Sequence, residues 1–313
     1  MAIDVNRLGR TFFAEVRGLD LRETLSDETV AEIRAAWMEH GVLVFPDQLL
    51  SDAQQVAFSM RFGPLEEDLI DPSKFIANLG NLDEDGKLRD PASLKSRFLR
   101  ANQLWHSDSA YFPAAAKLSF LNGRQIASDM EGGETQWADM RAAYDELSAD
   151  MRASIEGKVV VHDMQTSRAK TGRLLSPEER AKWPPVHHPM VRVHEETGCK
   201  ALYVGSQATC VTGWDEAASQ KLFAELMDFA TQDRFVHTHR WRQGDLVCWD
   251  NRRVVHRQVA FDEARFPRVV VRTTVRGTGP DVIDGKPVDE YERLKTLSVH
   301  GRERVASEAS RVR

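Results

Sequence analysis

Two histidines and one aspartate in this chain have the types and spacing of a metal-binding set. His106 and Asp108 are separated by one residue, and His256 lies far downstream. In an extended strand alternate side chains project to the same side, so we expect His106 and Asp108 to face the same way. If His256 folds back beside them, two imidazoles and one carboxylate form a face that leaves the opposite metal positions open, as in Fe(II) oxygenases. These ligand types also suit Mn(II) and Zn(II), so the set alone does not select the metal.

Two arginines downstream of His256 predict that the site binds anions. Arg268 and Arg272 lie in a predicted strand, and because they are four residues apart they share one of its faces. A guanidinium binds a carboxylate through paired hydrogen bonds, and a buried guanidinium needs such a partner. Two arginines that face the metal therefore predict two bound carboxylates. The alternative is a surface strand whose arginines pair with acids such as Asp262 or Glu263.

Composition and charge argue against several classes of function. Apolar residues make up 42% of the 313 residues and charged residues 29%, which are ordinary values for a globular protein. The formal net charge of -6 argues against a nucleic-acid-binding surface, which would be basic. There is no apolar signal segment and no apolar run of about 18 residues, so we expect neither secretion nor a membrane span. The three cysteines form no CxxC pair, and we expect them to stay reduced in the cytoplasm.

The elements that must position these side chains are many short strands and a few helices. Helices are predicted after two capping serines, Ser26 and Ser51, and across residues 215–230. The predicted buried stripe of the last helix is Ala218, Leu222, Leu226 and Phe229. The predicted strands are 42–45, 118–126, 136–138, 235–239, 246–249 and 269–274. This pattern favours a mainly β fold with flanking helices (α+β), arranged as a jelly-roll, cupin-like barrel.

Two segments lack this regular pattern. Residues 65–104 are predicted to be mostly loop, and the polar residues 165–188 to form a lid or an insertion. We see neither an internal repeat nor a break in composition that would mark a second domain. The expectation is a single catalytic domain over 1–313, with a core at about 8–275 and a polar C-terminal tail at 276–313.

Several motifs together give the chain a family resemblance. They are the stretch from Asn102 to Asp108, Gly132-Gly133-Glu134-Thr135, Trp249-Asp250-Asn251 ahead of His256, and Arg268 beyond it. As a set they resemble the taurine-dioxygenase-type Fe(II)/2-oxoglutarate-dependent dioxygenases, and are most similar to the 2,4-dichlorophenoxyacetate dioxygenase branch. The stretches 139–145 and 239–247 match that branch as well. The resemblance runs from about residue 8 to 275, and only the combination of motifs is specific.

The resemblance implies a fold and a reaction. The fold is a double-stranded β-helix in which His106, Asp108 and His256 bind Fe(II). The cosubstrates are 2-oxoglutarate and O2, and succinate and CO2 are released as the substrate is hydroxylated. Because Asp108 completes the ligand set, hydroxylation is favoured over halogenation, which related iron enzymes perform without this carboxylate.

The resemblance also implies how 2-oxoglutarate is held. Thr135 and Arg268 would bind its distal carboxylate while its other end chelates the metal, and Asn102 would form a hydrogen bond near the iron face. The gap between His256 and Arg268 is one residue longer than the family pattern suggests, so Arg265 remains an alternative anchor. Arg268 is favoured because it opens a valine-rich strand.

The substrate is expected to be a small organic anion. Arg272 would bind its carboxylate, Tyr111 would line an aromatic pocket, and Arg100 would be a secondary anchor. Core packing for Tyr111 and a solvated surface position for Arg100 are the alternatives. The resemblance favours an aryloxyalkanoate, a phenoxyacetate-like acid whose ether is cleaved to a phenol and an oxo acid.

We also expect the protein to form a homo-oligomer.

Other functions remain open at this point. The same oxygenase class could act on a sulfonate, an alkyl sulfate or a natural carboxylic acid, since arginine binds all of these anions. A zinc metallohydrolase could use the same three ligands, but Thr135 and Arg268 would then have no role. A noncatalytic barrel that binds a small acid is disfavoured because no member of the ligand set is missing.

Overall fold

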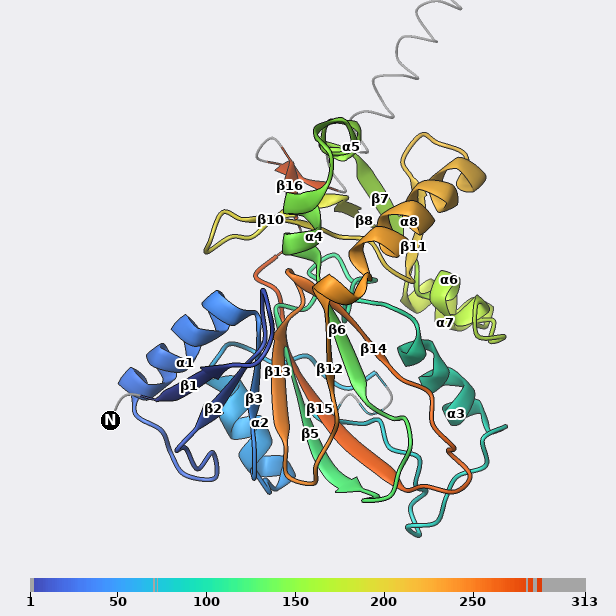
Figure 1. Ribbon diagram of the computed structural model, residues 1–313. Coiled ribbons are helices and arrows are strands. Elements are labelled where there is room, and N and C mark those ends of the chain that lie inside the picture. Colours follow the sequence, from blue (N-terminus) through green and yellow to red (C-terminus); the bar gives the residue numbers. More distant parts are fainter. Residues whose placement is uncertain (1–2, 70, 72, 280, 284–285, 289–313) are drawn as a thin grey trace, which may run out of the picture.

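The largest element of the structure is a seven-stranded sheet. The computed structural model of the protein describes residues 3–69, 71, 73–279, 281–283 and 286–288. The strand order is β1-β2-β3-β13-β5-β15-β4, so strands from both ends of the chain alternate at its centre (Figure 1). In that order the strands are Asp4–Arg7, Ala14–Arg17, Val42–Phe45, Leu246–Asp250, Leu118–Ile126, Arg268–Val275 and Ala77–Asn78. The predicted strands at 42–45, 118–126, 246–249 and 269–274 are confirmed.

A three-stranded sheet packs against this large sheet. It has the order β12-β6-β14, with bounds Val236–His239, Thr135–Asp139 and Val254–Gln258. A buried cluster joins the sheets, with Trp137 and Val254 from the small sheet and Trp249, Val247 and Leu121 from the large one. The ring centroids of Trp137 and Trp249 lie 5.7 Å apart. Part of the core therefore lies between the two sheets.

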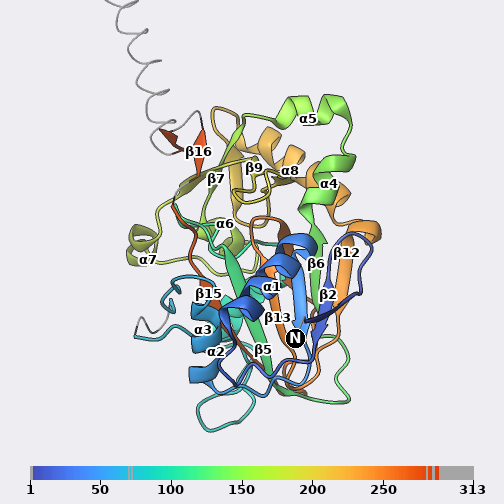
Figure 2. The ribbon, with the colours of Figure 1, turned by 90° about the vertical axis from the view of Figure 1, so that its left-hand side faces the viewer.

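Two N-terminal helices cover the other side of the large sheet (Figure 2). They are α1 (Asp27–His40) and α2 (Asp52–Met60). Ser26 and Ser51 cap them by accepting backbone N–H groups, which confirms the two predicted helix starts. Phe58 of α2 packs against Phe120 of β5 at 5.5 Å between ring centroids. The helices thereby bury the apolar face of the sheet that points away from Trp137.

The remaining helices and strands extend the chain beyond the two sheets. The helices are α4 (Met140–Glu146), α5 (Ala149–Ile155), α8 (Glu216–Ala230) and the 3-10 helix η2 (Asp233–Phe235). The strands are β7 (Val159–His162), β8 (Val186–Pro189), β9 (Val191–Val193), β10 (Lys200–Leu202), β11 (Ala208–Val211), β16 (Val282–Ile283) and β17 (Lys286–Pro287). A second core lies in this part of the chain, where α4 and α8 pack on β7, β10 and β11. No helix in the described ranges is long and apolar enough to cross a lipid bilayer.

Both segments that were expected to be irregular contain helices. Residues 65–104 include α3 (Leu94–Leu99) and the 3-10 helix η1 (Arg100–Gln103). The 165–188 segment contains most of α6 (Met164–Ala169) and all of α7 (Pro177–Lys182). Ser93 caps α3, and Ser176 with Glu179 forms a capping box on α7. Most of the predicted tail at 276–313 lies outside the described residues.

Candidate active site

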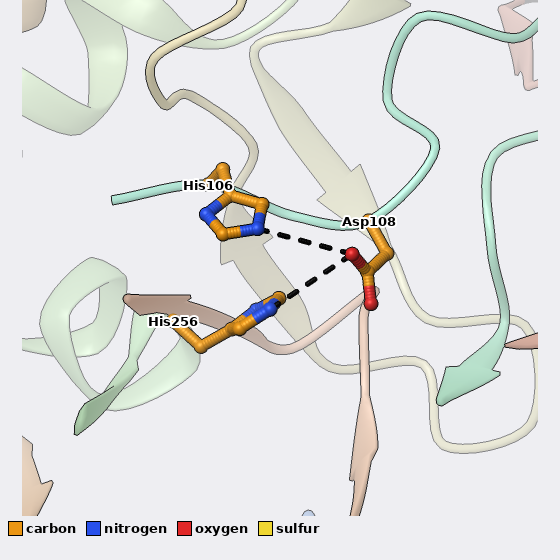
Figure 3. Close-up of side chains that lie close together, drawn as sticks. All are labelled: His106, Asp108 and His256. Atoms are coloured by element: carbon orange, nitrogen blue, oxygen red, sulfur yellow. Dashed lines mark ion pairs between the residues drawn. The ribbon is translucent and has the colours of Figure 1, made fainter. Parts of the chain in front are cut away.

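The two histidines and the aspartate meet in one buried cluster. The possible ligand atoms of His106, Asp108 and His256 all lie within 4.8 Å of one another. Asp108 Oδ1 lies 3.8 Å from His106 Nε2 and 3.9 Å from His256 Nε2, and Figure 3 shows both rings turned toward this oxygen. The three residues are 6%, 3% and 6% exposed. Two imidazole nitrogens and one carboxylate oxygen at this separation can hold a divalent transition metal on one face.

The backbone brings the two histidines together. His106 N–H donates to the carbonyl of His256 at 3.0 Å, and His256 N–H donates back to the carbonyl of His106 at 2.8 Å. The expected extended strand through Asp108 is wrong, because His106 forms only an isolated bridge and the chain turns from Asp108 onward. Ser109 adopts φ 55°, a left-handed conformation that belongs to this turn. The pairing with His256, and not alternation along a strand, therefore positions His106.

Hydrogen bonds orient the three side chains. His106 Nδ1 lies 2.7 Å from the carbonyl oxygen of Leu104. Because a carbonyl can only accept, Nδ1 carries the proton. The lone pair of Nε2 is then free to bind a metal on the side where Asp108 lies. Ser119 Oγ donates to Asp108 Oδ2 at 2.7 Å and accepts from Asn251 Nδ2 at 2.9 Å. Asn251 Oδ1 in turn accepts the backbone N–H of Asp108. These contacts give the Trp249-Asp250-Asn251 stretch a role, because Asn251 holds the metal-binding residue Asp108 in place. Ser119 has the same role but was not identified from the sequence.

The protonation states suit metal binding. Burial lowers the pKa of His106, and burial together with the neighbouring His106 lowers the pKa of His256 well below its ordinary value. Burial alone would raise the pKa of Asp108, but the Arg272 guanidinium and the two imidazoles outweigh it and the pKa falls to about 2. At neutral pH the cluster therefore contains neutral imidazoles and an ionised carboxylate, the forms that bind metals.

A pocket beside the cluster contains the residues predicted to bind 2-oxoglutarate. Its walls include Asn102, Thr135, Arg268 and His256. Arg268 is 3% exposed, and its Nε donates to the carbonyl of Gly133 at 2.9 Å. Burial lowers its pKa to about 10, and no carboxylate in the described part of the chain lies within ion-pair distance of it. A buried guanidinium that has no carboxylate partner among the described residues suits a bound carboxylate.

Thr135 lines this pocket, whereas Arg265 does not. Thr135 Oγ1 accepts a hydrogen bond from Trp241 Nε1 at 2.9 Å, so its own hydroxyl proton remains available to a ligand. Arg265 is exposed and its guanidinium lies over the ring of Phe266. The geometry thus favours Arg268 over Arg265 as the anchor for 2-oxoglutarate.

A second pocket lies on the other side of Arg272. Its walls include Arg272, Tyr111, Glu66, Phe98 and Leu99. Arg272 also lines the first pocket and forms an ion pair with Asp108, so it connects the two spaces. Tyr111 is buried, and burial raises its pKa to about 12, so it stays a neutral hydrogen-bonding group.

Arg100 is not part of either pocket wall. This half-buried arginine donates to the carbonyl oxygen of Pro91 at 2.8 Å. Of the residues predicted to bind cosubstrate or substrate, the structure therefore brings Asn102, Thr135, Arg268, Arg272 and Tyr111 around the metal cluster and leaves Arg100 outside.

Glu66 is a residue of this site that the sequence analysis did not identify. Its Oε2 accepts from Ser109 Oγ at 2.6 Å, while its Oε1 is buried without a partner in the described structure. Burial raises the pKa of Glu66 to about 7. A carboxyl group beside Arg272 therefore titrates near neutrality, a behaviour typical of functional sites.

Glu66→Gln should stabilise the metal-free protein above pH 7 and leave it unchanged near pH 4.5. Because the pKa rises from 4.5 to about 7 on folding, the folded state retains a proton that the unfolded state releases, and stability falls as the pH rises through this interval. Glutamine avoids that loss, so the variant should gain on the order of 3 kcal/mol well above pH 7. Urea unfolding at about pH 5 and about pH 8 measures the difference, with the exposed Glu67→Gln as control. An equal difference at both pH values would contradict the assignment.

Comparisons with known proteins identify the family of this chain. Residues 4–274 match the model of the family described as "Taurine catabolism dioxygenase TauD, TfdA family". The chain is 42% identical over 273 residues to the alpha-ketoglutarate-dependent 2,4-dichlorophenoxyacetate dioxygenase of Cupriavidus pinatubonensis, covering 84% of this chain and 94% of that protein. It is 37% identical over 270 residues to the (S)-phenoxypropionate/alpha-ketoglutarate-dioxygenase of Sphingobium herbicidovorans, covering 83% and 91%.

A solved structure of similar sequence has the same fold as this chain. The crystal structure of AAD-2 in complex with Mn(II) and N-oxalylglycine superposes with a TM-score of 0.84 at 38% identity, covering 91% of this chain and 100% of that one. Both the sequence and the mixed α/β fold are thus shared over nearly the whole described chain. The chain therefore belongs to the taurine catabolism dioxygenase (TauD, TfdA) family and is an Fe(II)/2-oxoglutarate-dependent dioxygenase.

Proposed function

We propose that this enzyme hydroxylates a small aryloxyalkanoate and thereby cleaves its ether. The observation that carries the proposal is the placement of two guanidinium groups, that of the buried Arg268 and that of the half-buried Arg272, in the pocket that adjoins the metal cluster. One carboxylate of the cosubstrate and one carboxylate of the substrate would match them. The relatives named for dichlorophenoxyacetate and phenoxypropionate, at 42% and 37% identity, support this class of acid.

The metal ligands in this proposal are His106, Asp108 and His256. The donor set fits Fe(II), since it offers two neutral imidazoles and one carboxylate and leaves one side of the metal open to other ligands. Fe(II) bound there would supply the activation of O2 that drives the oxidative decarboxylation of 2-oxoglutarate to succinate and CO2. Ser119 and Asn251 hold Asp108 in place, and the Leu104 carbonyl holds His106.

Arg268 and Thr135 bind 2-oxoglutarate in this proposal. The guanidinium of Arg268 would form an ion pair with the distal carboxylate, and the free hydroxyl proton of Thr135 would donate to it. The Gly133 carbonyl and the Trp241 indole fix these two side chains before the ligand arrives. Preorganisation of this kind reduces the entropy lost on binding. Asn102, on the wall of the same pocket, would donate its amide to a ligand near the metal.

Arg272 orients the substrate by its carboxylate. The side chain reaches Asp108 and also lines the second pocket, so an acid held by Arg272 has its adjacent carbon close to the metal cluster. Hydroxylation of a carbon that bears the aryl ether oxygen gives a hemiacetal, which collapses to a phenol and an oxo acid. Tyr111 and Phe98 would then flank the aryl ring.

The fold and organisation complete the proposal. We infer a double-stranded β-helix, supported by the packing of the sheet β12-β6-β14 on the seven-stranded sheet and by the alternation of early and late strands. A single catalytic domain, a cytoplasmic location and a homo-oligomeric assembly remain predictions.

The test is succinate formation by iron-loaded enzyme given 2-oxoglutarate, O2 and a panel of acids. The panel contains aryloxyacetates, 2-aryloxypropionates, taurine, alkyl sulfates and plain aryl carboxylates. Succinate together with a phenol from the aryloxy acids alone is the expected result. Turnover confined to taurine or alkyl sulfates would contradict the aryloxyalkanoate substrate but not the 2-oxoglutarate-dependent oxygenation. Failure of every acid, with zinc bound at stoichiometry in place of iron, would overturn the proposal.

A further inference from the structure

Arg168 is a buried arginine to which the described residues offer neither a hydrogen-bond acceptor nor a carboxylate. It lies on α6, in the segment that the sequence marks as a lid or an insertion, and is 7% exposed. Its Nε is buried without a hydrogen bond, and in the described structure its guanidinium has neither a hydrogen-bond acceptor nor a carboxylate within ion-pair distance. Buried charges in proteins are ordinarily paired, so the position calls for an explanation.

The guanidinium of Arg168 packs on a wall residue of the second pocket. Its central carbon is 3.9 Å from the ring centroid of Phe98, and Phe98 lines the second pocket together with Arg272 and Tyr111. Burial lowers the pKa of Arg168 to about 10, with Tyr111 opposing the shift and Arg272 adding to it. The charge of Arg168 also lowers the pKa of His106. Arg168 therefore adjoins, through Phe98, the pocket that Arg272 and Tyr111 line.

Stacking on Phe98 does not account for the burial. A cation–π contact offsets only part of the free energy that a guanidinium loses when it is removed from water, and it leaves the N–H donors of Arg168 without acceptors. Arg173, in the same segment, offers a direct comparison. It also lies over Phe98, at 5.0 Å, but it is paired with Glu179 at 2.6 Å. The segment thus supplies a carboxylate to Arg173 and none to Arg168.

We propose that Arg168 is a specificity-determining residue that binds the anionic group of the substrate together with Arg272. This inference rests on the proposed function, because it assumes that the substrate carries a carboxylate into the pocket beside the metal cluster. A carboxylate has lone pairs enough to accept from both guanidinium groups. Arg272 is already paired with Asp108, whereas the charge of Arg168 is unmatched until the ligand arrives. The segment that carries α6 and α7 thereby completes the substrate pocket.

The two arginines define the class of substrate further. Arg168 and Arg272 favour a carboxylate over an amide or an ester, because only the anion neutralises their charges. Phe98 and Tyr111 add aromatic surface next to the anion site. An aryl group a short distance from a carboxylate matches this combination.

The experiment measures the binding of phenoxyacetate to enzyme loaded with Fe(II) and 2-oxoglutarate, without O2, by calorimetry. Arg168→Met removes the charge and keeps the length of the side chain, and Arg168→Lys keeps the charge without the planar fork. Arg180→Met removes the same charge from an exposed position on α7. Neutral phenoxyacetamide serves as the second ligand, and the affinity for 2-oxoglutarate is measured for every variant.

Arg168→Met should weaken phenoxyacetate binding by about tenfold to a hundredfold, which is typical for the loss of a hydrogen bond to a charged group. Arg168→Lys should lie between it and wild type, and Arg180→Met should match wild type. Phenoxyacetamide and 2-oxoglutarate should bind all variants alike, which a general loss of structure would not give. Unchanged phenoxyacetate binding in Arg168→Met, or equal losses for the acid and the amide, would overturn the inference while the proposed function stands. If wild type itself binds no phenoxyacetate, the aryloxyalkanoate proposal fails and the inference fails with it.

Discussion

His256→Ala should abolish succinate formation and lower the affinity for Fe(II) by at least about a hundredfold. Loss of a residue that only supports a metal ligand costs roughly 10–100-fold in affinity or activity, so the loss of a ligand sets this lower limit. The backbone of position 256 would still pair with His106, because both hydrogen bonds of that bridge come from main-chain groups. The fold should therefore survive while the metal site loses one of three donors. Anaerobic titration with Fe(II) and a succinate assay measure the two effects.

Two further variants make this result specific. His187→Gln, on β8, changes a half-buried histidine outside the three-residue cluster and should keep both metal binding and turnover. His106→Ala should behave like His256→Ala, because the two rings face Asp108 in the same way. Wild-type iron affinity in His256→Ala would remove this residue from the ligand set and reopen the question of the metal centre.

Arg268→Met should raise the KM for 2-oxoglutarate by at least about a hundredfold. Removal of one partner from a buried ion pair costs about 3–5 kcal/mol, and each 1.4 kcal/mol is about tenfold in affinity. Methionine fills much of the same space, so the loss reflects the missing charge and its hydrogen bonds. The KM for the substrate should change far less, because Arg272 is untouched. Steady-state kinetics with each cosubstrate varied separately checks the difference.

Arg265→Met is the matched control for this prediction. Arg265 lies three positions earlier in the chain but is exposed, so its loss should leave the KM for 2-oxoglutarate close to wild type. A large rise in that KM for Arg265→Met, with little change for Arg268→Met, would reverse the assignment made from the pocket walls.

The sequence was most informative where short-range patterns decide the structure. Ser26 and Ser51 mark two helix starts because capping depends on residues within one turn. The last helix is predicted with nearly correct bounds, and of its predicted stripe Leu226 is buried while Leu222 and Phe229 are partly buried against the core. Ala218 is exposed, and the fully buried residues also include Ser219, Phe223 and Ala230. Ser219 is buried because its hydroxyl accepts the backbone N–H of Val211 on β11, a tertiary contact that periodicity cannot reveal.

The same limit applies to the site. The spacing of His106 and Asp108 predicts a shared metal, but a turn and the pairing with His256 produce the geometry. Glu66 and Arg168 belong to the site through side chains that meet only after folding, and neither lies in a recognisable motif. The capping box from Ser176 to Glu179 is a local signal for α7 that was available in the sequence and was not used.

The bridge between His106 and His256 has a consequence for the synthesis of the protein. During translation the emerging chain presents His106 and Asp108 long before His256, so for most of that time only two of the three donors exist. The centre of the large sheet is also incomplete, because β13 separates β3 from β5 and is made late. A two-donor site binds metals weakly and with little selectivity. All three donors are therefore available to a metal only after His256 has emerged, late in synthesis.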